Sequence, residues 1–119
     1  MSLFEELKEL GVNVEEGLER VMDDEPLYEM MLGMFIDTVN SNPIEMADFD
    51  ADGLEVLIGR VHALKGITGN LSMTPLFTGY VQTLDLLRTG RSKEAEKEYE
   101  QILPAQTAIM DCIKRYMNN

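Results

Sequence analysis

Residues 54–71, LEVLIGRVHALKGITGNL, decide the fold that we expect for this chain. Apolar side chains recur in this stretch at intervals of three and four residues, which predicts a helix with one buried face. The predicted members of that face are Leu54, Leu57, Val61, Leu64, Thr68 and Leu71. We expect the helix to run from about Gly53 to Ser72. His62, the only histidine in the sequence, lies off the centre of this face.

Two further helices are expected before this segment. A short one follows Asn13-Val14-Glu15-Glu16, which has the form of a capping box. The next follows Asp24 as its cap, with Pro26 in its first turn. Its predicted core stripe consists of Leu27, Met30, Met31, Met34, Phe35 and Thr38. Asn42-Pro43 should interrupt this helix near its end.

Two helices are expected after it. Thr74-Pro75 caps and starts one that Gly90 ends, and another begins near Ser92 and runs almost to the C-terminus. Pro104 predicts a bend in the last helix or its division into two. Long amphipathic helices joined by short loops favour an all-α fold, an antiparallel up-and-down four-helix bundle with a short extra N-terminal helix. Residues 1–119 should form a single domain.

Composition excludes several classes of function. The 119 residues include 22 acidic and 10 basic side chains, a net charge of −12, which disfavours binding to nucleic acid or to an anionic membrane. One cysteine, Cys112, cannot form an intrachain disulfide, and one histidine excludes multi-histidine metal sites. The acidic start is unlike a secretory signal and no apolar run could span a membrane, so we expect a cytoplasmic protein.

The acidic stretch from Asp48 to Gly53 resembles the opening of a calcium-binding EF-hand loop. Position 12 of such a loop should be a bidentate glutamate, and the residue there is Gly59. We therefore predict a turn that leads into a helix, with Asp52 and Glu55 favoured by the helix dipole.

Three glycines share the helix face that carries His62. Helical geometry places Gly59, Gly66 and Gly69 within about one side-chain width of it, and each costs about 1 kcal/mol relative to alanine. Their absence of side chains would let another protein approach the imidazole. Lys65, one turn further on, would attract an oxyanion, and a neutral imidazole is a good nucleophile. Spacing alone leaves a phosphoryl acceptor and an ordinary boundary histidine equally open.

The segment His62-Ala63-Leu64-Lys65-Gly66-Ile67-Thr68-Gly69-Asn70-Leu71, followed by Leu76, resembles the motif of the histidine-containing phosphotransfer (HPt) domain family. The family pattern is a histidine, any residue, an aliphatic residue, lysine, glycine, then small residues and an aliphatic one. Residues 10–18, 27–35 and 84–90 are similar to other helices of the family. The resemblance therefore extends over nearly the whole chain.

This resemblance implies a role in a two-component phosphorelay. His62 would accept a phosphoryl group from a receiver-domain aspartyl phosphate and pass it to another receiver aspartate. Lys65 would stabilise the phosphoryl oxygens, and Gly66 would let the partner approach. The sequence departs from the family pattern at Ile67, usually a small residue, and at Ser72, usually glycine. An outward-pointing Ile67 would narrow partner choice, and Ser72 would change how the helix ends.

The expected partners are response-regulator receiver domains, a hybrid sensor histidine kinase, or both. The chain has no Walker loop and no kinase signature, so we expect a phosphoryl carrier without kinase activity of its own. It should be a free-standing monomer with no cofactor or metal, Mg²⁺ being held by the receiver. An apolar patch around His62, drawn from Ile58, Met73 and the second helix, should contact the partner. Asn70 is interpreted as a solvated polar residue.

Two other functions were weighed. The chain could be a helical protein–protein interaction module whose histidine is never phosphorylated. It could also be an enzyme that uses paired carboxylates, but its acidic residues are scattered as expected for a solvated surface. Transfer of phosphoryl label to His62 would separate the phosphorelay role from both.

Overall fold

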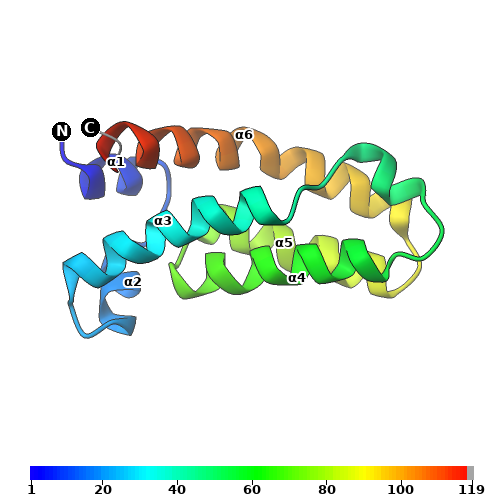
Figure 1. Ribbon diagram of the computed structural model, residues 1–119, viewed down its shortest axis with the longest axis horizontal. Helices are drawn as coiled ribbons and strands as arrows, with labels where there is room; N and C mark the ends of the chain where they lie inside the picture. Colours follow the sequence, from blue (N-terminus) through cyan, green and yellow to red (C-terminus); the bar gives the residue numbers. More distant parts are fainter. Residues whose placement is uncertain (118–119) are drawn as a thin grey trace.

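The computed structural model describes residues 1–117, which form six α-helices, one short 3-10 helix and no β-strand. The all-helical prediction is therefore confirmed for this part of the chain. Figure 1 shows that the longer helices extend along the molecule and that the two short N-terminal helices lie at one end. The elements are α1 (Leu3–Glu9), α2 (Val14–Arg20), α3 (Glu25–Ser41), η1 (Met46–Asp50), α4 (Glu55–Asn70), α5 (Thr74–Arg88) and α6 (Ser92–Met117).

Helix α4 matches its prediction closely. Its buried residues are those of the predicted stripe, except that Leu54 is only partly buried. The helix begins at Glu55 and ends at Asn70, within the expected Gly53 to Ser72. It packs against both α3 and α5, so one face enters the core and the opposite face stays in solvent.

The predicted core stripe of α3 is correct at Phe35 but wrong at Met30 and Met34. Asp24 caps the helix and Pro26 lies in its first turn, as expected, and the helix ends at Ser41, before Pro43. However, Met30 is 56% exposed and Met34 is 48% exposed. Of the predicted stripe only Phe35 is fully buried, and the other buried side chains, Tyr28 and Leu32, lie outside it. Apolar residues surround most of this helix, so spacing alone could not identify the face that enters the core.

The N-terminal region contains two short helices where one was expected. Ser2 and Glu5 form a reciprocal capping box that starts α1, a pattern that the sequence analysis did not use. Asn13 caps α2, as predicted, because its side-chain oxygen accepts a hydrogen bond from the Glu16 backbone N–H at 3.1 Å. The side chain of Glu16 makes more distant contacts, described below.

Helices α5 and α6 complete the core. α5 is preceded by Met73, not Thr74, as its N-cap, and Gly90 follows its end with a φ of +76°. α6 continues through Pro104 as one helix, so the division into two is not observed. Cys112 on this helix is buried, as expected for a small core residue.

The acidic segment before α4 forms the 3-10 helix η1. Two of its aspartate side chains bond to residues outside this helix. Asp48 Oδ2 accepts a hydrogen bond from the Glu45 backbone N–H at 2.8 Å, and Asp50 Oδ1 lies 3.1 Å from Lys93 Nζ. Phe49, which lies between these two aspartates in the sequence, is buried. Within residues 1–117, no group of three or more metal-ligating side chains is placed to hold an ion. No helix in that range is long and apolar enough to cross a membrane.

Candidate functional site

His62 is exposed in the middle of α4. Val61, which precedes His62, is buried, and so is Leu64, which follows His62 by two positions. Their burial fixes the rotation of the helix about its axis. The imidazole therefore lies on the solvent side, where another molecule can reach it. The expectation that His62 lies off the buried face is confirmed.

The three glycines near His62 have different surroundings. A Cβ at Gly59 or Gly66 would have no other heavy atom within 4 Å, so nothing inside this molecule requires glycine at either position. A Cβ at Gly69 would lie 2.9 Å from Phe77 Cε1. Gly69 is therefore explained by the packing of α4 on α5, and only Gly59 and Gly66 leave bare surface beside the histidine.

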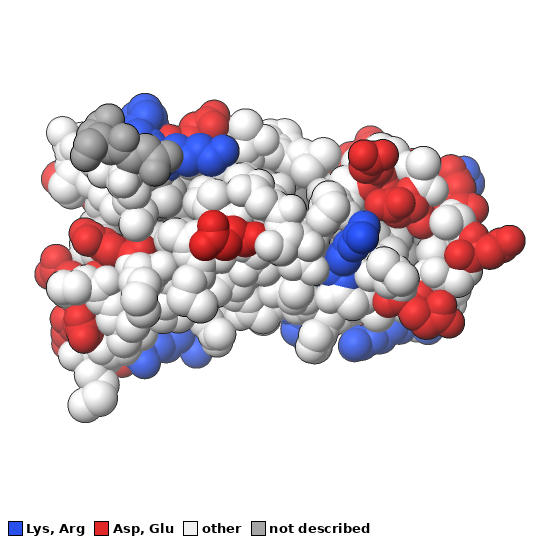
Figure 2. Space-filling view, in the orientation of Figure 1, with Lys and Arg blue, Asp and Glu red and all other residues white. Residues whose placement is uncertain are grey.

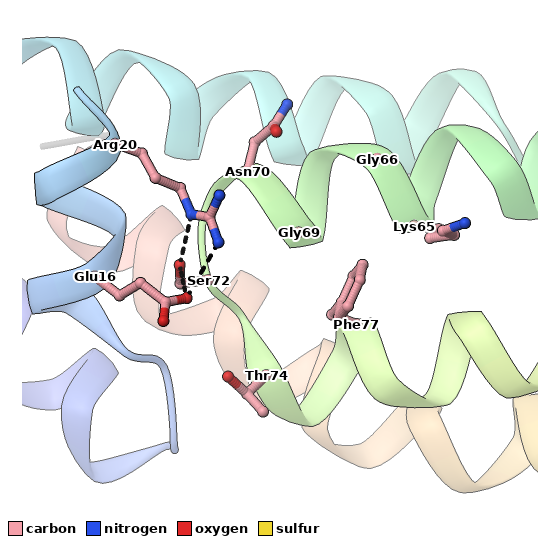
Figure 3. Close-up of a pocket in the computed structure, with 9 residues that line it drawn as sticks. All are labelled: Glu16, Arg20, Lys65, Gly66, Gly69, Asn70, Ser72, Thr74 and Phe77. Carbon is pink, nitrogen blue, oxygen red and sulfur yellow. Dashed lines mark hydrogen bonds and ion pairs between the residues drawn. The ribbon is translucent and has the colours of Figure 1, made fainter.

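Lys65 follows His62 by three residues and is half-buried. In the described part of the chain, no carboxylate lies within ion-pairing distance of its ammonium group. Figure 3 shows the side chain at the far end of a pocket that also contains Gly66 and Gly69. A cation without a carboxylate partner, one helical turn from an exposed imidazole, is suited to bind an anionic group that reaches His62.

The apolar residues around His62 differ from those expected. Met73 is fully buried, so it cannot contribute to a surface patch. Ile58 is half-buried, and Ile67 packs partly against the core instead of pointing freely into solvent. The exposed large apolar side chains on these two helices are Val56 of α4 and Met30 and Met34 of the neighbouring helix α3.

Two hydrogen bonds hold α3 beside α4. At the end of α3, the Pro43 carbonyl accepts from Arg60 Nη1 at 2.7 Å. At its start, Tyr28 Oη donates to the Leu71 carbonyl at 2.9 Å, and burial raises the pKa of Tyr28 to about 12. These two bonds tie both ends of α3 to α4 and to the turn that follows α4.

Charge is unevenly distributed over that side of the molecule. Figure 2 shows acidic side chains gathered toward both ends of the face that carries α3 and α4. The surface between them is mostly uncharged but carries an acidic group near its centre and a basic group beside it.

The turn after α4 is closed by Ser72, which has a left-handed φ of +56°. The Met73 N–H bonds to the Thr68 carbonyl at 2.9 Å, and the Ser72 N–H bonds to the Gly69 carbonyl at 3.1 Å. This pair of bonds is a Schellman motif, whose left-handed position most often holds glycine. Ser72 therefore adopts a left-handed conformation that glycine adopts without penalty, at a cost in backbone strain.

The Ser72 hydroxyl connects this turn to α2. It donates to Glu16 Oε1 at 2.7 Å and accepts from Arg20 Nε at 3.2 Å. Arg20 Nη2 also lies 3.3 Å from Glu16 Oε1. The hydrogen bond from Ser72, followed by that from Arg20, lowers the pKa of Glu16. The sequence analysis placed Glu16 only in the capping box and did not connect Glu16 or Arg20 with Ser72, because Ser72 lies more than fifty positions away from both.

A pocket of about 360 Å³ lies between α2, α4 and the start of α5. We call it the α2–α4 pocket, and Figure 3 shows its residues. Arg20 lies at one end and Lys65 at the other, with Phe77 between them. The lining residues are Glu16, Arg20, Lys65, Gly66, Gly69, Asn70, Ser72, Thr74 and Phe77.

Comparison of the chain with models of protein families, with curated proteins and with solved structures finds no match.

Proposed function

We propose that this chain is a histidine phosphotransfer protein of a two-component phosphorelay. His62 accepts a phosphoryl group from the aspartyl phosphate of a receiver domain and passes it to the aspartate of another. The observation that carries the proposal is an exposed imidazole flanked by two bare glycine positions, with a lysine one turn away that pairs with no carboxylate among residues 1–117. The sequence resemblance to the HPt family assigns the same residue the same role.

The transfer step uses the lone pair of one ring nitrogen of His62. That nitrogen forms a bond to phosphorus while the bond from phosphorus to the receiver's aspartate oxygen breaks, and the aspartate leaves as a carboxylate. The reverse reaction passes the group to the next receiver. Lys65 stabilises charge on the phosphoryl oxygens, and the receiver supplies Mg²⁺. The chain acts as a carrier and has no kinase activity of its own.

Each bare glycine has a role in this step. In-line transfer requires the receiver aspartate to approach the imidazole closely. Side chains at Gly59 and Gly66 would project into the space that the receiver must enter, since nothing in this molecule occupies it. Met30 and Met34 extend the contact surface onto α3, where flexible methionine side chains adapt to a partner.

The proposal also includes a finer description of the fold. We infer that α3, α4, α5 and α6 form an antiparallel up-and-down four-helix bundle, with the chain acting as a cytoplasmic monomer. Support comes from the packing of α4 on α3 and α5, the packing of α5 on α6, and the short connections after α4 and α5.

Two phosphoryl donors test the function. The purified chain is incubated with phosphoramidate, a small-molecule donor, and separately with phosphorylated receiver domains encoded in the same genome. We expect a mass increase of one phosphoryl group that is lost in acid and is absent from His62→Gln. Because His62 is exposed, this variant should fold normally, which thermal unfolding followed by circular dichroism would establish.

Two outcomes would contradict the proposal. Stable binding of a receiver with no transfer of label would assign the chain to the alternative class of helical interaction modules. Label that persists in His62→Gln would assign the phosphoryl group to another residue.

A further inference from the structure

The α2–α4 pocket adjoins the surface on which a receiver would dock. Gly66 and Lys65 belong both to the neighbourhood of His62 and to the lining of the pocket. A partner whose backbone approaches over Gly66 therefore covers one edge of the pocket. Its side chains can enter a space of about 360 Å³ that no residue of this chain fills.

The lining is suited to an anionic group of the partner. It contains two cations, Arg20 and Lys65, and one carboxylate, Glu16. Since Lys65 is assigned to the phosphoryl oxygens, Arg20 is the cation left for an acidic side chain, whose carboxylate its guanidinium matches. Since the whole chain carries a net charge of −12, an acidic side chain is repelled by most of the remaining surface.

Arg20 is positioned to hold such a carboxylate. Its guanidinium is fixed by Ser72 through Nε at 3.2 Å and by Glu16 through Nη2 at 3.3 Å. A guanidinium carries more N–H donors than these two contacts use, and its planar fork matches a carboxylate. Figure 3 shows the guanidinium between the end of α4 and Glu16, where these remaining donors border the pocket. The group is therefore held in place before any partner arrives, which reduces the entropy lost on binding.

We propose that the α2–α4 pocket receives a carboxylate side chain of the docked receiver domain, with Arg20 as the residue that binds it. This inference rests on the proposed phosphotransfer function and adds a determinant of partner choice away from the histidine. Arg20 acts on docking and not on the transfer chemistry, because it lies on α2 while His62 lies in the middle of α4.

The test measures the rate of transfer from a receiver that labels His62, over a range of receiver concentrations. Arg20→Gln should raise the half-saturating concentration about tenfold, the equivalent of one charge-assisted contact, and leave the maximal rate unchanged. Arg91→Gln is the matched control. Both arginines are about half exposed, at 51% and 57%, and each pairs with a glutamate of its own helical turn.

Arg20→Gln also removes the contacts of Arg20 with Ser72 and Glu16, so a second variant changes the pocket without changing Arg20. Thr74→Leu adds bulk at the edge of the pocket from an exposed position whose side chain makes no hydrogen bond within residues 1–117. It should also raise the half-saturating concentration. Labelling of His62 by phosphoramidate should be unchanged in both variants, because that donor has no side chain to place in the pocket.

Several results would overturn the inference. These are equal effects of Arg20→Gln and Arg91→Gln, no effect of either pocket variant, or slower labelling by phosphoramidate in Arg20→Gln. Saturable binding of inorganic phosphate at Arg20 without a receiver, followed by NMR, would assign the pocket to a free anion instead. A wild-type chain that no donor labels would refute the phosphotransfer function itself, which is a separate result.

Discussion

The Ser72 hydroxyl donates a hydrogen bond of 2.7 Å to Glu16 Oε1, joining the turn that ends α4 to a helix 56 residues earlier in the chain. The same hydroxyl accepts from Arg20. One side chain thus closes the histidine-bearing helix and attaches α2 to it. The position of one wall of the α2–α4 pocket depends on this contact.

Two substitutions at Ser72 should separate its side-chain contacts from its backbone strain. Ser72→Ala loses both hydrogen bonds and retains the left-handed φ of +56°, so we expect the free energy of unfolding to fall by about 1–2 kcal/mol. Ser72→Gly loses the same bonds but relieves strain of about 1 kcal/mol, so its stability should lie closer to wild type. Urea unfolding measures both, and an Ala variant as stable as the Gly variant would contradict this account.

The stability of the molecule should fall in acid partly through Glu16. Hydrogen bonds from Ser72 and Arg20 lower its pKa in the folded state below the usual 4.5. Its contribution is therefore fully present above pH 4.5 and is lost as the pH falls through the lower, folded-state pKa. Thermal unfolding across this range should show a smaller decrease for Glu16→Gln than for wild type. Identical pH profiles would show that the carboxylate contributes nothing through this linkage.

The three glycines of α4 should respond differently to alanine. Gly59→Ala and Gly66→Ala should each raise the free energy of unfolding by about 0.5–1 kcal/mol, because the new methyl group meets no other atom. Gly69→Ala should lower it by about 1 kcal/mol, since its Cβ would lie 2.9 Å from Phe77 Cε1. Gly59→Ala and Gly66→Ala should each combine higher stability with slower transfer from a receiver, because both positions face the space that the receiver must enter. Equal stabilisation by all three substitutions would refute the distinction between bare and packed positions.

Lys65 should affect the rate of transfer itself. Lys65→Gln removes the cation one turn from His62, and we expect the maximal rate from a receiver to fall about tenfold, the effect of losing one charge contact in the transition state. Lys97→Gln, an exposed position on α6, provides the control for a general change in charge. A maximal rate unaffected by Lys65→Gln would remove this residue from the site.

The exposed methionines of α3 should contribute to docking and not to folding. Met30 and Met34 are 56% and 48% exposed, so changing both to glutamine should leave the thermal midpoint almost unchanged. The half-saturating receiver concentration should rise about tenfold, because partly exposed methionines would be buried at the interface. Met22, which is 91% exposed in a turn between α2 and α3, is the control for the same substitution. Equal effects at Met22 would indicate a nonspecific change of surface.

The sequence allowed α4 and its exposed histidine to be predicted, because the apolar residues spaced by three and four in 54–71 are the ones that enter the core, apart from the partly buried Leu54. In α3 apolar residues lie on several sides of the helix, so the same spacing wrongly placed the exposed Met30 and Met34 in the core stripe. The contacts among Ser72, Glu16 and Arg20 were also out of reach. Glu16 and Arg20 are one helical turn apart, but no local pattern relates them to Ser72, which only the packing of α2 against the end of α4 brings to them.

The bare positions at Gly59 and Gly66 have a consequence for motion. Glycines without packing partners weaken a helix locally, so the amide protons of α4 around His62 should exchange with solvent sooner than those of α5. A partner that covers this surface supplies the missing contacts and should slow that exchange. The histidine-bearing helix would then reach its most rigid state only while another protein is bound to it.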